Sequence, residues 1–317
     1  MTKSVEEILD DLRPKLALLE TRRQQMRDKA KKWTLYGAII AALGALGFLL
    51  HPIVGVMGLI GGLATIFIPR GVNSSRYKKT FKAEVMPIIV QSVCPSMSFN
   101  AGASISEETF EQSRIFLSSP DRYSGEDLFS GSIGKTSIAF SEIHAEERRT
   151  TTDSDGNTKT EYETIFSGLF FVTEFHKHFK SETYVLPDFS ESWMGRIGRK
   201  LQKWNWSRPD LVEMENLEFE KEFVVYGTDQ IESRYLITPD MMDRILELKR
   251  NFKANVHLSF LSSKLYIAVD TNRDFFEASF SKSLLTSQQV ETIVRELQRC
   301  IQIVEILNLN TRIWTKE

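Results

Sequence analysis

Three residues of the stretch FSGSIGKTSIAF, Gly134, Lys135 and Thr136, match the last three residues of the phosphate-binding P-loop motif. The complete motif is GxxxxGK[ST] between a strand and a helix, because the loop amides and the helix amino end hold the phosphates. Phe129 occupies the first glycine position, and the SIAFSEI that follows alternates like a strand. The sequence therefore does not favour a nucleotide site, and we expect Gly131 and Gly134 to be turn residues leading into a strand.

Two other stretches carry side chains that bind metal ions in some proteins. Asp153, Asp155 and Asn157 match the first ligands of a calcium loop, but the glycine position is not met and the flanks are strand-like. His176 and His178 would share one face of a strand, yet no third ligand has a local spacing. We favour a hairpin tip and surface histidines, and we predict no metal, no cofactor and no catalytic residue.

Charge and cysteine content exclude further classes of protein. The 317 residues include 40 basic and 42 acidic side chains, a balance that does not point to nucleic acid. The two cysteines, Cys94 and Cys300, are far apart and fit neither a disulfide framework nor a zinc ribbon. A reducing compartment is therefore expected.

The stretch from Trp33 to Pro69 contains no Asp, Glu, Lys or Arg. One membrane span needs about 17–25 apolar residues, so the halves 33–50 and 53–69 predict two short spans. The turn is expected at His51-Pro52, because proline disfavours helix at the residue before it. The sequence predicts a transmembrane helical hairpin, and a buried hairpin of a soluble protein is the less favoured reading.

Basic clusters flank this apolar stretch on both sides, RRQQMRDKAKKW before it and RGVNSSRYKKTFK after it. Positively charged flanks remain on the cytoplasmic side of a membrane. We therefore predict a multi-pass protein of the inner (plasma) membrane with both termini in the cytoplasm.

Small residues recur at four-residue spacing within the two halves, a pattern that lets helices approach closely in lipid. The residues are Gly37, Ala41, Ala45, Gly58 and Gly62. The pattern fits packing within the hairpin, which we favour, or oligomerisation through the membrane.

The segment ESWMGRIGRKLQKWNWSRPD combines tryptophan with lysine and arginine, as helices on a lipid headgroup surface do. If it is helical, its apolar face would contact either the membrane or the protein's own core. Binding to nucleic acid is the less favoured interpretation, because the overall charge is nearly balanced. The residues predicted at the membrane surface are Trp193, Arg196, Ile197, Arg199, Lys200, Leu201, Lys203, Trp204 and Trp206.

The remaining patterns predict an α+β fold with a mostly antiparallel sheet. A capping box at residues 4–7 starts a helix over 4–32, which Pro14 should kink or split. Further helices are predicted at 76–93, 106–118 and 239–252, and a long C-terminal helix begins at the Thr286-x-x-Gln289 cap. Strands are predicted at 136–149, 158–175, 218–227 and 231–238, one more within 176–188, and a hairpin at 256–261 and 264–270.

These elements divide the chain into four parts. We expect an N-terminal cytoplasmic helix (1–32), a two-helix transmembrane hairpin (33–69), a helical connector (70–120) and a cytoplasmic α+β domain (121–317). The last part would contain one or two β units, with a division near 190–215.

The strings IFSGLFFVTEFHKHFKSETYVLPD and FEKEFVVYGTDQIESRYLITPDMMDRILEL, after a charged helix and an apolar hairpin, carry a family resemblance. Over roughly residues 4–305 the chain resembles an uncharacterised bacterial inner-membrane family, domain of unknown function 3137. The resemblance implies a bacterial inner-membrane protein with a cytoplasmic α+β domain, and it supplies no functional residues.

The leading functional hypothesis is a non-enzymatic, membrane-anchored cytoplasmic scaffold that binds a protein or lipid partner. An oligomeric assembly or small pore gated by the cytoplasmic domain is the alternative. A hydrolase with a dispersed site around His176, His178 or His144 is less favoured. The expected partners are the lipid bilayer and another protein or a second copy of the chain, and not nucleic acid.

Overall fold

The computed structural model describes residues 5–49, 51–152, 158–188, 208–285 and 288–310. The chain forms two compact units, each built from two stretches of sequence. Unit 1 comprises Met1–Val93 and Phe276–Glu296, and unit 2 comprises Cys94–Phe275 and Leu297–Glu317. The helix α9 (Gln288–Ile306) contributes residues to both units.

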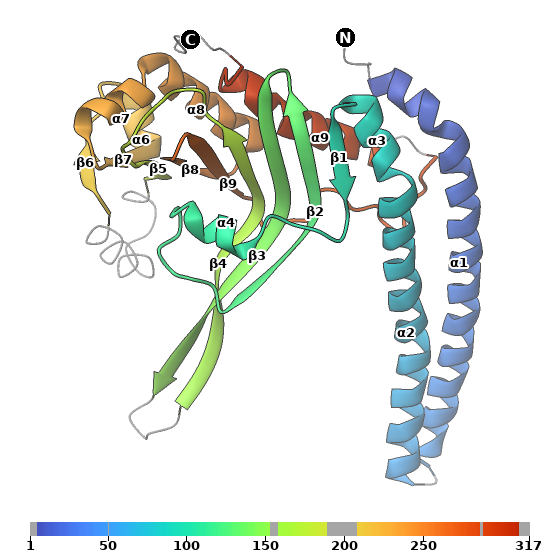
Figure 1. Ribbon diagram of the computed structural model, residues 1–317. Coiled ribbons are helices and arrows are strands. Elements are labelled where there is room, and N and C mark those ends of the chain that lie inside the picture. Colours follow the sequence, from blue (N-terminus) through green and yellow to red (C-terminus); the bar gives the residue numbers. More distant parts are fainter. Residues whose placement is uncertain (1–4, 50, 153–157, 189–207, 286–287, 311–317) are drawn as a thin grey trace. The chain divides into compact units, whose positions relative to one another are not determined.

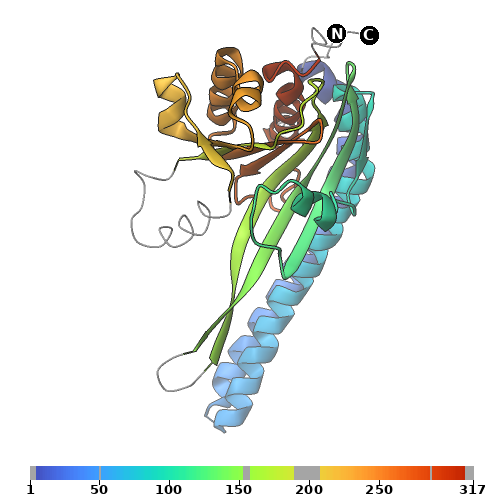
Figure 2. The ribbon, with the colours of Figure 1, turned by 60° about the vertical axis from the view of Figure 1, so that its left-hand side comes forward.

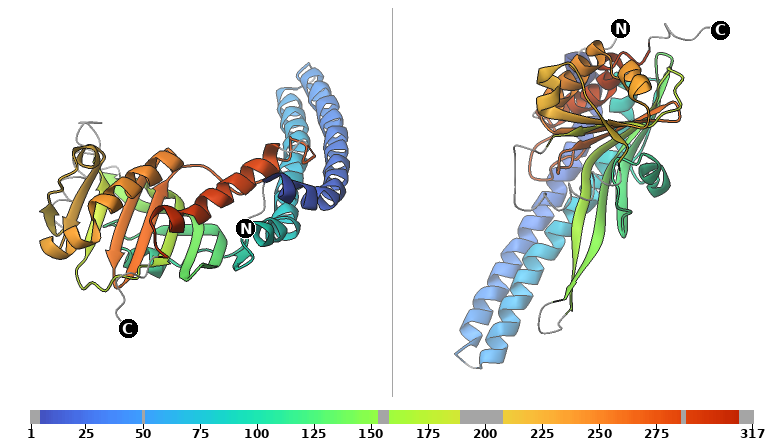
Figure 3. Two further views of the ribbon diagram at one scale, coloured as in Figure 1. Left: turned by 90° about the horizontal axis from the view of Figure 1, so that it is seen from above. Right: turned by 90° about the vertical axis from the view of Figure 1, so that its left-hand side faces the viewer.

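Unit 1 contains the helices α1 (Val5–Gly47), α2 (Pro52–Glu84) and α3 (Met86–Val93). The two long helices lie side by side in every view (Figures 1 and 3). At the start of α2, the His51 side chain accepts a hydrogen bond from the Ile53 amide at 3.2 Å, and proline occupies the first turn. Proline suits that position because its missing N–H would have no helical partner there. The break between the helices therefore falls at the predicted turn.

Two predictions for unit 1 need correction. Pro14 does not split helix α1, which continues from Val5 to Gly47, and apolar side chains of the turns on either side of Pro14, including Leu12 and Leu16, are buried. Helix α2 continues past the apolar stretch to Glu84, so no separate helix begins near residue 76. The buried side chains of Tyr77 and Phe81 hold this extension of α2 in the interior of the unit.

Unit 2 is built on a single sheet in which all the pairings between described strands are antiparallel. The strand order is β1-β2-β3-β4-β9-β8-β5-β7-β6. The strands are β1 (Met97–Asn100), β2 (Arg122–Ile133), β3 (Thr136–Thr152), β4 (Thr158–Glu174), β5 (Thr183–Pro187), β6 (Asp210–Val212), β7 (Phe223–Gly227), β8 (Asn255–Leu261) and β9 (Lys264–Asp270). The helices are α4 (Glu107–Gln112), α6 (Leu217–Glu222), α7 (Gln230–Leu236) and α8 (Pro239–Phe252). A mixed fold of helices and antiparallel sheet with a C-terminal helix is thus confirmed.

Both faces of this sheet are covered by apolar side chains. On one face Phe129, Phe140 and Phe171 lie in a row across β2, β3 and β4, with ring centroids 4.6 Å and 5.1 Å apart. The ring of Phe252 in α8 packs edge-on against that of Phe171 on the same face, with centroids 6.3 Å apart. Because neighbouring residues of a strand point to opposite faces, Phe170 lies on the other face. There its ring is 5.2 Å from that of Phe110 in α4.

The outer halves of β3 and β4 project from the sheet as a two-stranded ribbon (Figure 2). Their pairing continues to Thr152 and Thr158, whereas β2 ends its pairing with β3 at Glu146 and β9 ends its pairing with β4 at Gly168. The ribbon therefore has no neighbouring strand on either side within the described residues.

Several predicted elements are confirmed, two are wrong, and the helix predicted at 106–118 ends at Gln112. The β3–β4 pair, helix α8 and the β8–β9 hairpin follow the predicted patterns closely. The stretch 231–238, predicted as a strand, begins with helix α7, because the Asp229 side chain accepts hydrogen bonds from the Ile231 and Glu232 amides at 2.8 and 2.9 Å. The stretch 218–227 is half helix, since Asn216 caps α6 before β7 begins. The Thr286 cap of the last helix lies outside the described residues.

Candidate functional site

Two features of unit 1 are candidates for function: the apolar surface of α1 and α2, and a basic cavity beside it. The stretch Pro52–Val93 is the one helical stretch, among the described residues, that is long and apolar enough to cross a membrane. Only 11% of its apolar 18-residue segment is buried inside the protein. Between residues 33 and 72, the exposed large apolar side chains of the two helices and of the turn that joins them are Trp33, Leu35, Tyr36, Ile39, Ile40, Leu43, Leu46, Phe48, Leu49, Ile53, Val54, Val56, Met57, Ile60, Leu63, Phe67, Ile68 and Val72.

Glycines hold the backbones of α1 and α2 close together. A Cβ added to Gly44 would lie 2.6 Å from the carbonyl carbon of Gly58, a distance that real Cβ atoms do not reach. A Cβ on Gly62 would likewise meet the amide nitrogen of Ala41, and one on Gly37 would meet the carbonyl oxygen of Gly62, each at 2.6 Å. The small residues therefore make contacts within the helix pair.

The structure places the predicted helix-packing residues unevenly. Gly37, Ala41, Gly58 and Gly62 lie between the two helices, whereas Ala45 is exposed. Gly44 was not predicted, although its contact with Gly58 is among the closest in the pair. Its spacing of seven residues from Gly37, two helical turns along the same face, was the available signal.

Replacing Gly58 by leucine is expected to push α1 and α2 apart, whereas the same change at Gly61 should not. A side chain at Gly58 would collide with the Gly44 backbone, while a Cβ at Gly61 meets only Ile40, at 4.0 Å. Overpacking of this kind costs about 1–3 kcal/mol. Pulsed electron spin resonance between labels on Leu35 and Ile68 should show the helices moving apart, towards ordinary packing distances of about 8–10 Å. Equal label distances in both variants would contradict this account of the pair.

A cavity of about 860 Å³ lies between the helix pair and the segment 277–281, beyond the end of the apolar stretch. Arg27 and Lys31 of α1 and Arg70 and Lys78 of α2 line it, and Glu277 is the only carboxylate among its lining residues. Lys78 forms an ion pair with Glu277, whose other oxygen lies 3.7 Å from the buried Lys82 Nζ. The cavity therefore has an excess of positive charge.

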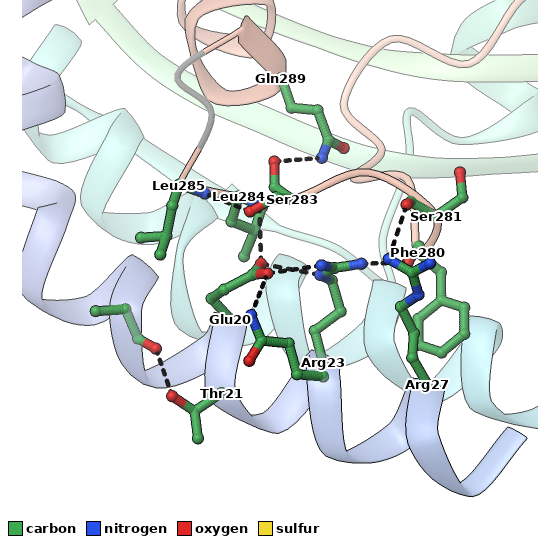
Figure 4. A network of polar contacts seen from close by, with 12 residues as sticks. Glu20, Thr21, Arg23, Arg27, Phe280, Ser281, Ser283, Leu284, Leu285 and Gln289 are labelled. Carbon is green, nitrogen blue, oxygen red and sulfur yellow. Dashed lines mark hydrogen bonds and ion pairs between the residues drawn. The ribbon is translucent and has the colours of Figure 1, made fainter. Parts of the chain in front are cut away.

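A buried ion pair fixes the segment that closes this cavity (Figure 4). Glu20 and Arg23 are 2% and 3% exposed, and two hydrogen bonds of 2.6 and 2.9 Å join the carboxylate to the guanidinium. Arg23 also donates to the Phe280 carbonyl at 2.9 Å, and Glu20 accepts from the Leu284 amide at 2.9 Å. The pair thus anchors both ends of the segment 280–284 to α1 (Figure 4).

Charge and hydrogen bonding determine the protonation state of this pair. The hydrogen bond from Arg23 outweighs the effect of burial and lowers the pKa of Glu20 to about 2. The same interaction raises the pKa of Arg23. Both groups are therefore charged at neutral pH.

Of the two sets of predicted metal candidates, the structure describes only the histidine pair. Asp153, Asp155 and Asn157 lie outside those residues, and His176 and His178 lie in the loop after β4. No cluster of three or more metal-ligating side chains occurs in the part of the chain that the structure describes.

The GKT stretch lies in the turn of a β-hairpin in unit 2. Ile133 pairs with Thr136, and Gly134 between them has a φ of +62°, which glycine adopts without strain. The Thr136 hydroxyl contacts Asn310 at 2.9 Å. A strand follows, where a P-loop requires a helix.

His144 is the histidine of the hydrolase hypothesis that lies beside a cavity. Its Nε2 is 3.4 Å from the Glu146 carboxylate, and it lines a space of about 370 Å³ together with Glu126 and Glu142. His257 is fully buried, and desolvation lowers its pKa to about 3, so it is neutral at physiological pH. Nothing in these contacts provides a nucleophile aligned with a base.

The predicted membrane-surface segment, from Trp193 to Trp206, lies outside the described residues. The basic cavity of unit 1 was not predicted as a site. Its bases were visible in the flanks of the apolar stretch, but the segment 277–281 that closes it lies about 200 residues away in sequence.

Part of the chain matches the model of a protein family. Residues 164–309 match the family described as "Protein of unknown function (DUF3137)". The resemblance to this domain of unknown function is therefore confirmed for that part of the chain, and the match contains no information about a membrane. No curated protein sequence matches the chain.

One solved structure is similar, the crystal structure of the mycobacterial trehalose monomycolate transport factor A, TtfA. The similarity covers 67% of this chain and 88% of that chain, with 7% sequence identity and a TM-score of 0.32. A likeness at that level does not support an inference about this chain's function.

Proposed function

We propose that the chain is a membrane-anchored binding module of the bacterial inner membrane. Helices α1 and α2 cross the bilayer as a two-span hairpin, and both termini are cytoplasmic. Unit 2 then engages a protein or lipid partner at the membrane as a scaffold.

The observation that carries this proposal is the exposed apolar surface of α1 and α2. Leu43 is 63% exposed and Ile60 is 61% exposed, and each lies near the middle of its own half of the uncharged stretch. Soluble monomers rarely expose apolar patches larger than a few hundred Å², since exposed apolar area costs about 25 cal/mol per Å² in water. Lipid tails would cover the same side chains without this cost.

The dimensions of the helix pair also suit a bilayer. The uncharged residues 52–69 of α2 are long enough to extend about 27 Å as a helix, close to the hydrocarbon thickness of about 30 Å. Trp33 and Tyr36 lie at the boundary of the stretch, with ring centroids 6.2 Å apart, where interfacial aromatics are typical. Basic side chains adjoin the stretch on both helices, since Lys31 and Lys32 precede it on α1 and Arg70 follows it on α2.

An oligomeric pore has less support than a simple anchor. The contacts of Gly37, Gly44, Gly58 and Gly62 are made inside the helix pair, so they do not require a second copy. Acidic, basic and histidine side chains line hydrated paths through membranes. Of these residue types the uncharged stretch contains His51 alone, and that residue caps α2 at the turn.

Cysteine accessibility in spheroplasts tests the proposed topology. In a variant with alanine at Cys94 and Cys300, cysteines at the exposed positions Thr21 and Lys79 should be protected from a membrane-impermeant maleimide until the cells are opened. A cysteine at His51 should react in intact spheroplasts, because the turn lies on the opposite side. Labelling of positions 21 and 79 on different sides would exclude the two-span hairpin, and recovery of the chain in the soluble fraction would exclude the anchor.

A further inference from the structure

We propose that the basic cavity of unit 1 binds the phosphate of an anionic phospholipid headgroup. This inference rests on the proposed membrane anchoring and deepens it by naming a lipid class and a site. It concerns the cavity between α1, α2 and the segment 277–281.

The cavity is large enough for a headgroup because small residues line the helices there. Its volume of about 860 Å³ is within the range of about 300–1,000 Å³ usual for ligand pockets. Ala30, Gly71 and Ser74 face it, and a Cβ added to Gly71 would meet no atom within 4 Å. Larger side chains at these three positions would fill the space.

The charge in the cavity is suited to an anion. Glu277 is engaged by Lys78 and Lys82, which leaves Arg27, Lys31 and Arg70 to face the space. The carboxylate of Asp28 is 3.5 Å from Lys31, but both of these side chains are about 70% exposed, so water and salt weaken their attraction. Arg70 has no ion pair or hydrogen bond among the described residues.

Two features provide directed donors for a phosphate. The Arg27 guanidinium is held by the Ser281 carbonyl, which accepts from one Nη at 3.3 Å. A guanidinium has five N–H donors, and the remaining ones can meet phosphate oxygens in pairs. The hydroxyls of Ser279 and Ser281, 2.8 Å apart, lie at the rim of the same cavity.

The cavity lies at the end of the apolar stretch, and this position favours a lipid over a soluble phosphate ester. Phe67 lines the cavity and is 63% exposed, and Arg70 is the first charged residue after the apolar stretch. One molecule with a phosphate and acyl chains would therefore contact the basic cavity and the apolar surface together. A free phosphate would use only the bases.

Basic residues flank membrane spans on the cytoplasmic side even where no lipid site exists. The test must therefore compare the basic residues that line the cavity with basic residues of the same flanks that do not. The lining variant Lys31→Gln/Arg70→Gln has a matched control, Lys29→Gln/Arg76→Gln. Both remove two charges from the same two helices near the ends of the apolar stretch, but Lys29 and Arg76 do not line the cavity. Gly71→Leu fills the cavity and leaves the charge unchanged.

The experiment is native mass spectrometry of the full chain in neutral detergent, titrated with phosphatidylglycerol or phosphatidylcholine. The unmodified chain should retain phosphatidylglycerol in preference to phosphatidylcholine. The lining variant should bind phosphatidylglycerol about 30-fold more weakly, at about 1 kcal/mol for each lost base. Gly71→Leu should show a similar loss, and the matched control should change by less than about threefold.

Three outcomes would overturn the inference. Equal retention of the two lipids, or an equal loss in the lining variant and its control, would show that the cavity does not select a headgroup. Displacement of phosphatidylglycerol by an equal concentration of inorganic phosphate would identify a site for free phosphate instead. Alkaline carbonate extraction of the same proteins distinguishes failure of the headgroup site from failure of the membrane anchor. A chain that stays in the pellet but shows one of these outcomes lacks only the site, whereas a chain that carbonate extracts contradicts the proposed function itself.

Discussion

Replacing Leu43 and Ile60 together by arginine is expected to abolish insertion of the chain into the membrane. Both side chains point away from the interior of the helix pair, and each lies near the centre of its uncharged segment. Arginine at the centre of a spanning helix costs about 2.5–3.5 kcal/mol, so two substitutions shift the insertion equilibrium by about 5–7 kcal/mol. Alkaline carbonate extraction should then move the chain from the membrane pellet to the supernatant or lead to its degradation.

A matched control separates insertion from general damage. Leu18→Arg/Ile231→Arg places the same charge on exposed apolar side chains, 56% and 81% exposed, outside the uncharged stretch. The control should remain in the pellet like the unmodified chain. Retention of the Leu43/Ile60 variant in the pellet would show that these side chains do not face lipid.

Local patterns in the sequence were sufficient to predict the elements that have clear capping or turn residues at their ends. Helix α8 begins at the Thr238-Pro239 signal, with the Thr238 hydroxyl accepting from the Met241 amide at 3.3 Å. The β8–β9 hairpin turns at Ser262 and Ser263, both at positive φ. In these cases the capping or turn residue and the hydrophobic period indicate the same structure.

The errors arose where apolar and β-branched residues outweighed a capping signal. The Asp229-x-x-Glu232 spacing is that of a helix start, yet the apolar residues of IESRYLIT suggested a strand. Strand β2 was missed before residue 128 because Gly125 and Asp127, the latter at a φ of +59°, interrupt its alternation at a register shift. In the folded chain, hydrogen bonds to β1 and β3 keep β2 in the sheet despite the interruption. The local sequence of β2 does not reveal these pairings.

The candidate site was less predictable than the fold, because distant segments build it. Glu20 and Arg23 continue the buried stripe of Leu12, Leu16 and Leu19 on α1, so their spacing already indicated burial. Their partners, in contrast, lie more than 250 residues later. A charged pair within an apolar stripe is the sequence signal that could have suggested such a contact.

Replacing Glu20 by glutamine is expected to release the segment 280–284 from α1. The change leaves the buried Arg23 charge without its carboxylate, and breaking a buried pair in this way costs about 3–5 kcal/mol. Hydrogen–deuterium exchange of the peptide containing Leu284 should become at least about 100-fold faster. Phe280 and Ser281, which line the cavity, should become less ordered as well, because Arg23 also donates a hydrogen bond to the Phe280 carbonyl.

The chain offers a control that differs mainly in burial. Arg22 and Glu84 form an ion pair at 2.9 Å, but both side chains are close to half exposed. Glu84→Gln should therefore cost no more than about 1 kcal/mol and leave exchange of the Leu284 peptide unchanged. Equal effects of the two substitutions would mean that burial of the Glu20–Arg23 pair has no special role.

The pH dependence of the same exchange distinguishes loss of the charge from loss of packing. The pKa of Glu20 is lowered to about 2 in the folded chain from an ordinary 4.5, so the folded state favours the ionised carboxylate. Its contribution is fully present above pH 4.5 and is lost as the pH falls towards 2. Exchange of the Leu284 peptide, corrected for its intrinsic rate, should therefore accelerate over that interval in the unmodified chain and much less in Glu20→Gln. Parallel pH profiles would show that the segment is held by packing and not by the ionised carboxylate.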